Sequence, residues 1–273
     1  MTQVNFIFAG LAAAMLASGA QAAEIGAEAL ASLPPVDVVV LGEVHDNPVH
    51  HENQARAVSA LTPRALVFEM LTPAQAARAT PAARGEAAAL EAALGWADSG
   101  WPDFALYYPI FAAAPEAAVY GGGLPRGDVR RAIAEGAAAV FGDDAAAFGL
   151  AAPLPEDEQA LRDEGQQAAH CNALPAEMLP GMVEAQRLRD AALARAVVQA
   201  LAENGGPVAV ITGNGHARKD WGLPAALAVA APDMTLLSIG QFEEAPEDDP
   251  PFDRWLITAP AERDDPCAGF SMQ

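Results

Sequence analysis

Short apolar runs alternate with stretches of helical periodicity along most of this chain. The runs are rich in β-branched residues and end at turn-forming residues, which is typical of buried strands. Strands are predicted at 36–41, 64–69, 117–121, 208–212, 235–239 and 255–258, and helices at 48–60, 73–78, 85–94, 103–114 and 224–229. This order predicts an α/β fold with a mostly parallel central sheet flanked by helices.

One long helical stretch interrupts the alternation. Residues of about 125–203 read as helix almost throughout, and we expect this large helical insert to act as a lid. Residues 243–253 are acidic and rich in proline, so they predict a loop with no reason to pack. Residues 23–273 are therefore expected to form a single α/β domain.

The first 22 residues have the pattern of an export signal. An apolar run, Phe6 to Ser18, precedes Ala20-Gln21-Ala22, which fits an A-x-A cleavage site, although no Lys or Arg precedes Glu24. The run is shorter than the roughly 20 apolar residues of a membrane span. No cysteine lies near the cleavage point for lipid attachment. We expect a cleaved signal peptide and a periplasmic protein without a stable membrane anchor; a buried N-terminal helix is the alternative.

Charge and cysteine content narrow the partners further. The formal net charge of −21 argues against nucleic acids and anionic membrane surfaces as ligands. Cys171 and Cys267 are the only cysteines, and they lack the spacing of a zinc site. In an oxidising compartment they could pair, but the sequence leaves this open.

Two glycine corners carry the candidate chemistry. Val38-Val-Val-Leu-Gly-Glu-Val-His45 and Val208-Ala-Val-Ile-Thr-Gly-Asn-Gly-His216 are both apolar runs that break at a glycine, with a histidine three residues later. Open α/β sheets bind ligands at the carboxyl ends of their strands. The corners are therefore expected to face one crevice.

Carboxylates accompany the two histidines. Glu43 lies in the first corner, and Glu69 ends the next predicted strand. Carboxylate and imidazole together suit a divalent metal ion or an acid–base pair. Glu43, His45, Glu69 and His216 are thus candidate metal ligands (for Mn, Fe, Co or Zn) and candidate catalytic residues of a hydrolase. The alternative is a set of hydrogen-bonded structural residues.

The helix after the first corner offers further polar residues. Asp46 or Asn47 is expected to cap it, and we favour capping as the role of Asp46. His50 and His51 are adjacent, so they point about 100° apart on a helix. Only one of them is expected to face inward.

Three further segments are candidates for ligand binding. Gln186 and Asp190 interrupt the apolar face of the helix at 178–203 and need partners, either His216 or Arg218; a purely structural network is equally consistent. Asn214 lies between two glycines in the second corner, and Arg218 follows it. Tyr107 and Tyr108 stand beside a proline, and tyrosine is an axial ligand of haem in some proteins. Aromatic packing is the alternative for both.

Several of these blocks resemble one family. LGEVHDNPVHHENQ, FEM, SGWPDFALYYPIF, HCNALP, the Gln186–Asp190 helix and ITGNGHARKD are similar to the ChaN-like family of the haem-binding uptake (Tiki-like) superfamily, which is related to TraB proteins and erythromycin esterases. The resemblance extends from about Val36 to Leu227. It implies an α/β protein that binds haem for iron uptake, with haem held in a homodimer.

The resemblance also implies roles for particular residues. Iron would be bound by a tyrosine, Tyr107, Tyr108 or Tyr120, and the propionates by Arg218 or Arg126. Asn214, Gln186 and Asp190 would belong to the same binding site. Other members of the superfamily use the glycine corners and a glutamate for metal-dependent hydrolysis, which here would fall on the four candidate ligands named above.

Overall fold

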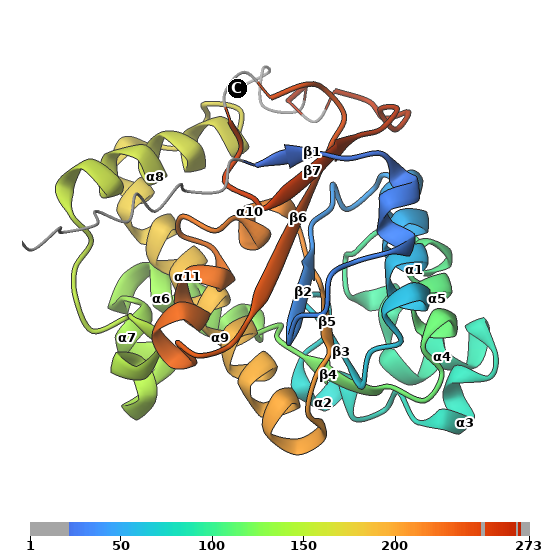
Figure 1. Cartoon of the computed structure of the whole chain (residues 1–273). Coiled ribbons are helices and arrows are strands. Elements are labelled where there is room, and N and C mark those ends of the chain that lie inside the picture. Colours follow the sequence, from blue (N-terminus) through green and yellow to red (C-terminus); the bar gives the residue numbers. More distant parts are fainter. Residues whose placement is uncertain (1–21, 247–248, 266, 269–273) are drawn as a thin grey trace, which may run out of the picture.

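The computed structural model describes residues 22–246, 249–265 and 267–268, and the predicted signal peptide lies almost entirely outside them. The described residues form a seven-stranded sheet in the order β1-β7-β6-β2-β5-β3-β4 (Figure 1). Every paired strand is parallel, which confirms the predicted fold class. The strands are β1 (Ala23–Glu24), β2 (Val38–Leu41), β3 (Ala65–Phe68), β4 (Ala118–Gly121), β5 (Val208–Ile211), β6 (Leu236–Phe242) and β7 (Arg254–Ile257).

Helices connect the strands in the expected places. Those before the insert are α1 (Pro48–Leu61), α2 (Pro73–Ala76), α3 (Pro81–Arg84), α4 (Ala87–Leu94) and α5 (Phe104–Ala113). The insert contains α6 (Arg126–Glu135), α7 (Ala137–Phe141), α8 (Glu156–Ala169) and α9 (Leu179–Asn204), and α10 (Asn214–Ala217) and α11 (Leu223–Ala230) follow β5. Short 3-10 helices lie at Ala27–Ala31, Trp96–Asp98, Asp143–Phe148 and Ala176–Met178.

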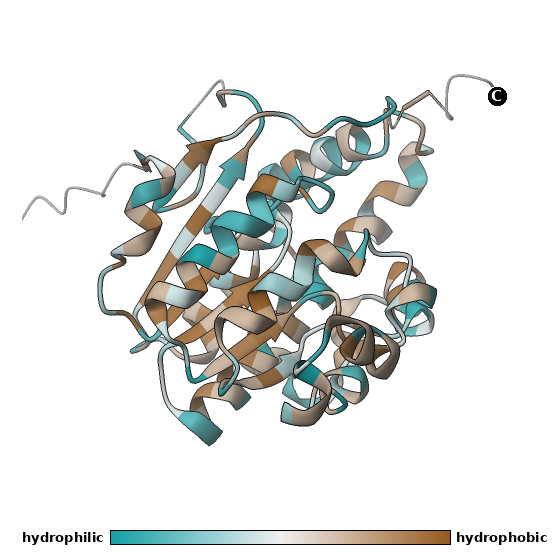
Figure 2. Ribbon diagram, turned by 90° about the vertical axis from the view of Figure 1, so that its right-hand side faces the viewer, coloured by the Kyte–Doolittle hydropathy of each residue, from teal (hydrophilic) through white to brown (hydrophobic). Residues whose placement is uncertain are grey.

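The strands at the centre of the sheet are apolar on both faces because helices cover both faces. All four residues of β2, β3 and β5 are buried. One face packs on α1 and α5, and the other packs on α9 and α11 (Figure 1). Figure 2 shows the same pattern in colour, with brown along the strands and more teal on the surrounding helices. Burial on both faces is the usual setting of a parallel sheet and of continuous apolar strands.

The helical insert forms most of the second covering layer. Its longest helix, α9, packs on β3, β4 and β5, and α6, α7 and α8 pack on α9. The C-terminal end of α9 leads into the start of β5, so its N-terminal half lies towards the carboxyl ends of the strands, where Gln186 and Asp190 contact His216 of the site described below. The insert thus supplies part of the site as well as part of the core.

Polar residues around α1 differ from expectation. Asn47 is the N-cap, and its side-chain oxygen accepts from the backbone nitrogens of Val49 and His50 at 2.9 and 3.4 Å. The capping role favoured for Asp46 is wrong, since Asp46 instead pairs with Arg263 at 2.7 Å.

The prediction that only one histidine of α1 faces inward is also wrong. His50 and His51 are both buried. Their side chains point to different parts of the domain. His51 faces the first glycine corner, whereas His50 contacts the Thr258 hydroxyl at 2.8 Å, just beyond β7. Residues far along the chain, Gln241 and Thr258, thus cover the face of α1 that was expected to be exposed.

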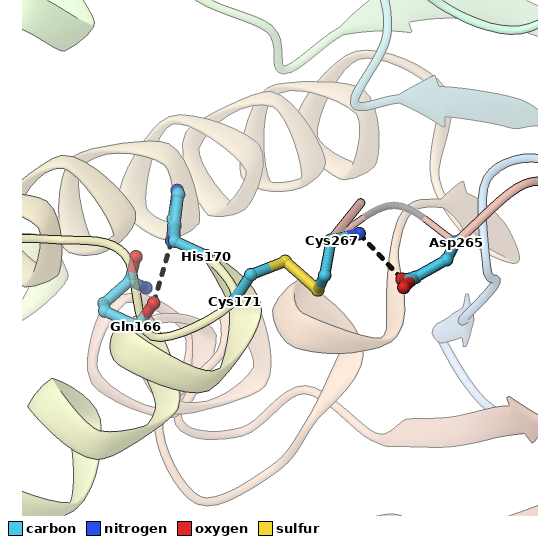
Figure 3. The surroundings of a disulfide bond; sticks show 5 residues. All are labelled: Gln166, His170, Cys171, Asp265 and Cys267. Atoms are coloured by element: carbon cyan, nitrogen blue, oxygen red, sulfur yellow. Dashed lines mark hydrogen bonds between the residues drawn. A yellow bond between two sulfur atoms is a disulfide. The ribbon is translucent and has the colours of Figure 1, made fainter. Parts of the chain in front are cut away.

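The C-terminal part is tied to the body of the domain. Phe252 of the predicted acidic loop is buried, and Glu243 pairs with Arg263 at 2.6 Å, so the described part of this loop packs more than expected. Cys171, just after α8, forms a disulfide with Cys267 (Figure 3). Among the described residues, no helix combines the length and the apolar character needed to cross a membrane.

Candidate functional site

The carboxyl ends of β2, β3 and β5 bring the two glycine corners together. Glu43 follows β2, Glu69 follows β3, and His216 lies in α10 directly after β5. A Cβ atom added at Gly213 would lie 2.9 Å from His45 Nε2 and 3.7 Å from a Glu69 oxygen. The second corner therefore needs glycine because the first corner and Glu69 approach its backbone.

Glu43 is buried at the centre of the first half of the site. Its Oε1 accepts from the Tyr107 hydroxyl at 2.9 Å and lies 2.7 Å from His45 Nδ1. Its Oε2 accepts from the Gln54 amide at 2.7 Å and lies 3.5 Å from His51 Nδ1. Three side-chain hydrogen bonds, from Tyr107, His45 and Gln54, thus hold this carboxylate in place, and His51 lies beside it.

His45 is the exposed member of this group. Its side chain is 33% exposed, and its ring packs on Trp101 with centroids 4.8 Å apart. Burial alone would lower the pKa of His45, but the hydrogen bond to Glu43 and the charges of Glu69 and Glu43 raise it above the ordinary value. When the ring is neutral, a proton on Nδ1 directed at Glu43 leaves Nε2 as the free nitrogen.

His216 is the centre of the second, fully buried half. Its Nδ1 lies 2.7 Å from Asp190 and its Nε2 lies 3.4 Å from Glu69. Burial opposes the charge on the ring, but the two carboxylates raise the pKa of His216 to about 10. His216 is therefore an imidazolium at neutral pH, held between Glu69 and Asp190.

The two carboxylates beside His216 differ in their surroundings. Burial raises the pKa of Glu69, but His216, His45 and the Gly213 N–H together hold it well below the ordinary value. The Glu69 oxygen that faces away from His216 accepts from Thr212 Oγ1 at 2.7 Å and from Gly213 N at 2.8 Å. Burial is the largest effect on Asp190 and raises its pKa. Asp190 and the side-chain amide of Gln186 both contact His216, at 2.7 and 3.0 Å, so the helix residues predicted to need partners meet His216.

A cavity of about 390 Å³ adjoins Glu69. Its apolar wall includes Trp101, Met70 and Leu193, and two cationic side chains, Arg126 and Arg189, also line it. Arg189 lies 3.9 Å from Glu69, and Arg126 donates to the backbone oxygen of Ser99 at 3.0 Å. The cavity therefore combines apolar surface with guanidinium groups beside the buried network.

Other predicted residues lie apart from this cavity. Arg218 forms a two-pronged pair with Asp220 at 2.6 Å and covers the Trp221 ring, and Asn214 exchanges hydrogen bonds with the backbone of Gln241. These contacts give both residues structural partners outside the crevice.

The three tyrosines also have partners of their own. Tyr107 is fully buried and donates to Glu43. Tyr108 donates to the Arg84 carbonyl at 3.3 Å, and the Tyr120 hydroxyl bonds Glu203 and Asn204. None of the three lines the cavity beside Glu69.

The expected metal site finds no support in the structure. Within the described ranges, no group of three or more His, Cys, Asp or Glu side chains is arranged to hold a metal ion. The four candidate ligands are divided between two hydrogen-bonded groups, Glu43 with His45 and Glu69 with His216. Their oxygens and ring nitrogens face each other rather than one common point.

Sequence reasoning missed three residues of the site. Gln54 has the only local signal, since it lies one turn after His51 on α1 and shares its buried face. Trp101 and Arg189 reach the cavity from segments that the sequence does not place near the strand ends. Their positions depend on how the loop before α5 and the helix α9 pack.

Comparisons with known proteins agree with the fold. The chain matches the family described as "Haem-binding uptake, Tiki superfamily, ChaN" over residues 29–227. In structure it is similar to ChaN of Campylobacter jejuni, which is described as binding haem cofacially. The TM-score is 0.61 and the identity 20%, over 82% of this chain and 88% of that chain. A weaker likeness links it to the type III effector HopBA1, with a TM-score of 0.45 and 13% identity over 86% of this chain and 92% of the effector. No curated protein matches the chain in sequence. The family match covers the two corners, the insert and the cavity, and the chain belongs to the haem-binding uptake, Tiki superfamily, ChaN family.

Proposed function

We propose that this protein binds haem and serves haem or iron uptake. The observation that carries the proposal is the family match, which spans all the elements that build the site, from β2 to α10. The similar ChaN of Campylobacter jejuni is described with cofacial haem. When bound, haem would supply an iron centre; the protein would supply the surface and side chains that hold it.

The cavity beside Glu69 offers apolar and cationic side chains that suit the macrocycle and the carboxylates of a haem. Trp101, Leu193 and Met70 offer apolar surface to a flat macrocycle, and Arg126 and Arg189 offer guanidinium groups to its carboxylates. Arginine binds carboxylates in a fixed two-pronged geometry. Of the two arginines expected to meet propionates, Arg126 lines the cavity, while Arg218 is already paired with Asp220.

We expect the double change Arg126→Ala with Arg189→Ala to weaken haem binding at least about tenfold, because a charge-assisted hydrogen bond contributes about 1.5–3 kcal/mol. The measurement is a titration of the chain from Ala23 with ferric haem, followed by its Soret band. Arg130→Ala is the matched control, since Arg130 lies one turn from Arg126 on the exposed side of α6. A wild-type protein that shows no saturable Soret change would refute the proposal. An unchanged haem affinity in the double variant would show that the two arginines do not bind the propionates.

The proposal includes a location and an assembly. A periplasmic location is supported by the Cys171–Cys267 disulfide, which suits an oxidising compartment, and by the A-x-A pattern before Ala23. A homodimer around the cofactor follows from the family resemblance. Mass spectrometry of the exported chain would test the predicted N-terminus at Ala23, and sedimentation with and without haem would test the dimer.

A second candidate function is hydrolysis, and one observation favours it. The His45 side chain is 33% exposed, its Nδ1 lies on a buried carboxylate, and its Nε2 makes no hydrogen bond to the described residues, which is the arrangement of a general base. The metal-dependent version would also require a divalent ion, and the described residues contain no cluster of ligands arranged to hold one. Ester hydrolysis that is present in the wild type and lost in His45→Ala would support this candidate; equal rates in both proteins would contradict it.

A further inference from the structure

A second cavity lies at the other end of the buried network around His216. It has a volume of about 270 Å³ and is bordered by α8, α9, α11 and the segment that begins at Phe148. Asp190 lines this cavity, whereas Glu69 lines the first one. His216 contacts both carboxylates and lines neither cavity. Each carboxylate therefore borders its own cavity, and we call the second one the Asp190 cavity.

One oxygen of Asp190 has no partner in the protein. The Asp190 side chain is only 4% exposed, and its Oδ1 lies 2.7 Å from His216 Nδ1. Its Oδ2 is buried, and no donor among the described residues bonds it. Buried carboxylate oxygens are normally hydrogen-bonded, because an unmet acceptor is costly in the interior. Since His216 takes up Oδ1, the Asp190 cavity is the space from which a ligand can supply the missing donor.

The other charged groups that line the Asp190 cavity are already paired. Three ion pairs account for them, Arg162 with Glu158, Arg187 with Glu184 and Arg218 with Asp220. The Arg187 guanidinium also donates to two backbone carbonyls, at 2.9 and 3.3 Å. Asp190 differs from these groups because it shares its cation, His216, with Glu69. A ligand with a positive charge thus complements this cavity better than a ligand with a negative charge.

The rest of the lining is mostly apolar. It includes the side chains of Phe148, Leu150, Leu154, Trp221 and Val229. Val229 is 53% exposed, so the apolar lining extends to the surface of the domain. Small-molecule sites typically combine an apolar wall with a few polar groups that fix the orientation of the ligand. This lining suits a ligand with a short hydrocarbon chain and one donor group.

We propose that the Asp190 cavity binds a small aliphatic amine, whose ammonium group donates to Asp190 Oδ2 while its hydrocarbon chain packs on the apolar lining. This site is separate from the cavity beside Glu69, and it does not depend on haem binding. An ammonium group is favoured over a hydroxyl group because a hydrogen bond between two charged groups is roughly twice as strong as one between neutral groups.

The first test compares three probes of equal length, n-pentylamine, pentanol and pentanoate, by nuclear magnetic resonance titration of the chain from Ala23 at pH 7. We expect saturable binding of pentylamine at one site, at least about tenfold weaker binding of pentanol, and no binding of pentanoate. Asp190→Asn keeps the shape of the side chain and removes its charge. It should weaken pentylamine binding at least about tenfold.

A second variant tests the cavity without changing the buried ion pair. Ala225 lines the cavity from α11, so Ala225→Leu should fill part of it and weaken pentylamine binding at least about tenfold. Ala228→Leu is the matched control, because Ala228 is an exposed residue of the same helix that does not line the cavity. This control should keep the wild-type affinity. Far-ultraviolet circular dichroism shows whether each variant remains folded.

The contrary outcomes are distinct. No saturable binding of pentylamine to the wild type would overturn the proposal. Equal affinities for pentylamine and pentanol, or a preference for pentanoate, would overturn the assignment of an ammonium ligand to Asp190. Full pentylamine affinity in a folded Ala225→Leu variant would place the amine outside this cavity. Haem titration of the same proteins is a separate measurement, so either proposal can fail while the other stands.

Discussion

Replacing His216 with alanine is expected to lower the free energy of unfolding by about 3–5 kcal/mol, the usual cost of removing one partner of a buried ion pair. His216 is 5% exposed and lies between Asp190, at 2.7 Å, and Glu69, at 3.4 Å. Without the imidazolium, the two buried carboxylates would lose their shared positive partner. Urea unfolding of the wild type and the variant at pH 7 measures the difference.

The same residue gives this prediction a pH dependence. The pKa of His216 is about 10 in the folded protein, against an ordinary value of 6.5. A raised folded pKa means that the stabilisation is fully present below pH 6.5 and is lost as the pH rises towards 10. Wild-type stability should therefore fall more steeply over this range than that of His216→Ala. Gln186→Ala is the control, since Gln186 contacts the same ring without carrying charge. A loss below about 1 kcal/mol, with parallel pH profiles, would show that His216 is not the imidazolium of a buried pair.

Replacing both Cys171 and Cys267 with serine is expected to lower the free energy of unfolding by about 2–4 kcal/mol. The disulfide joins residues 96 positions apart, so it restricts a long loop of the unfolded chain. It also attaches the C-terminal tail to the turn after α8 (Figure 3). Thermal unfolding with and without a reductant measures the effect. The reductant should destabilise the wild type and leave the serine variant unchanged; equal unfolding temperatures of wild type and variant would contradict the prediction.

The parts of the fold that the sequence predicted are those with local signals. The apolar runs of β2 and β5 each end at a glycine, and parallel strands bring such ends to one edge, so the approach of the two corners followed from pattern alone. The requirement of Asp190 for a partner could likewise be derived from helical spacing, because a buried carboxylate on an apolar face is costly without one. The structure supplies that partner in His216.

The parts that sequence reasoning missed depend on distant contacts. His50 contacts Thr258, 208 positions away, and nothing in the sequence near α1 indicates that this distant segment covers His50. Tyr107 reaches Glu43 across 64 positions, so its burial could not be read from the aromatic segment in which it stands. Arg218 is the exception, because its partner Asp220 is only two residues away and could have been considered from the sequence. β1 has just two residues, too few for any periodic signal.

The position of β6 has a consequence for the boundary of the folding unit. The family match ends at residue 227, yet β6 pairs with β2 in the middle of the sheet and separates it from β7. A chain cut at the end of the match would leave β2 as a bare, fully apolar edge, the kind of strand that associates with other chains. It would also lose Gln241, whose amide bonds the Gly42 carbonyl at the first glycine corner. The folding unit of this chain therefore extends beyond the matched residues, because the sheet needs β6 to cover the edge of β2.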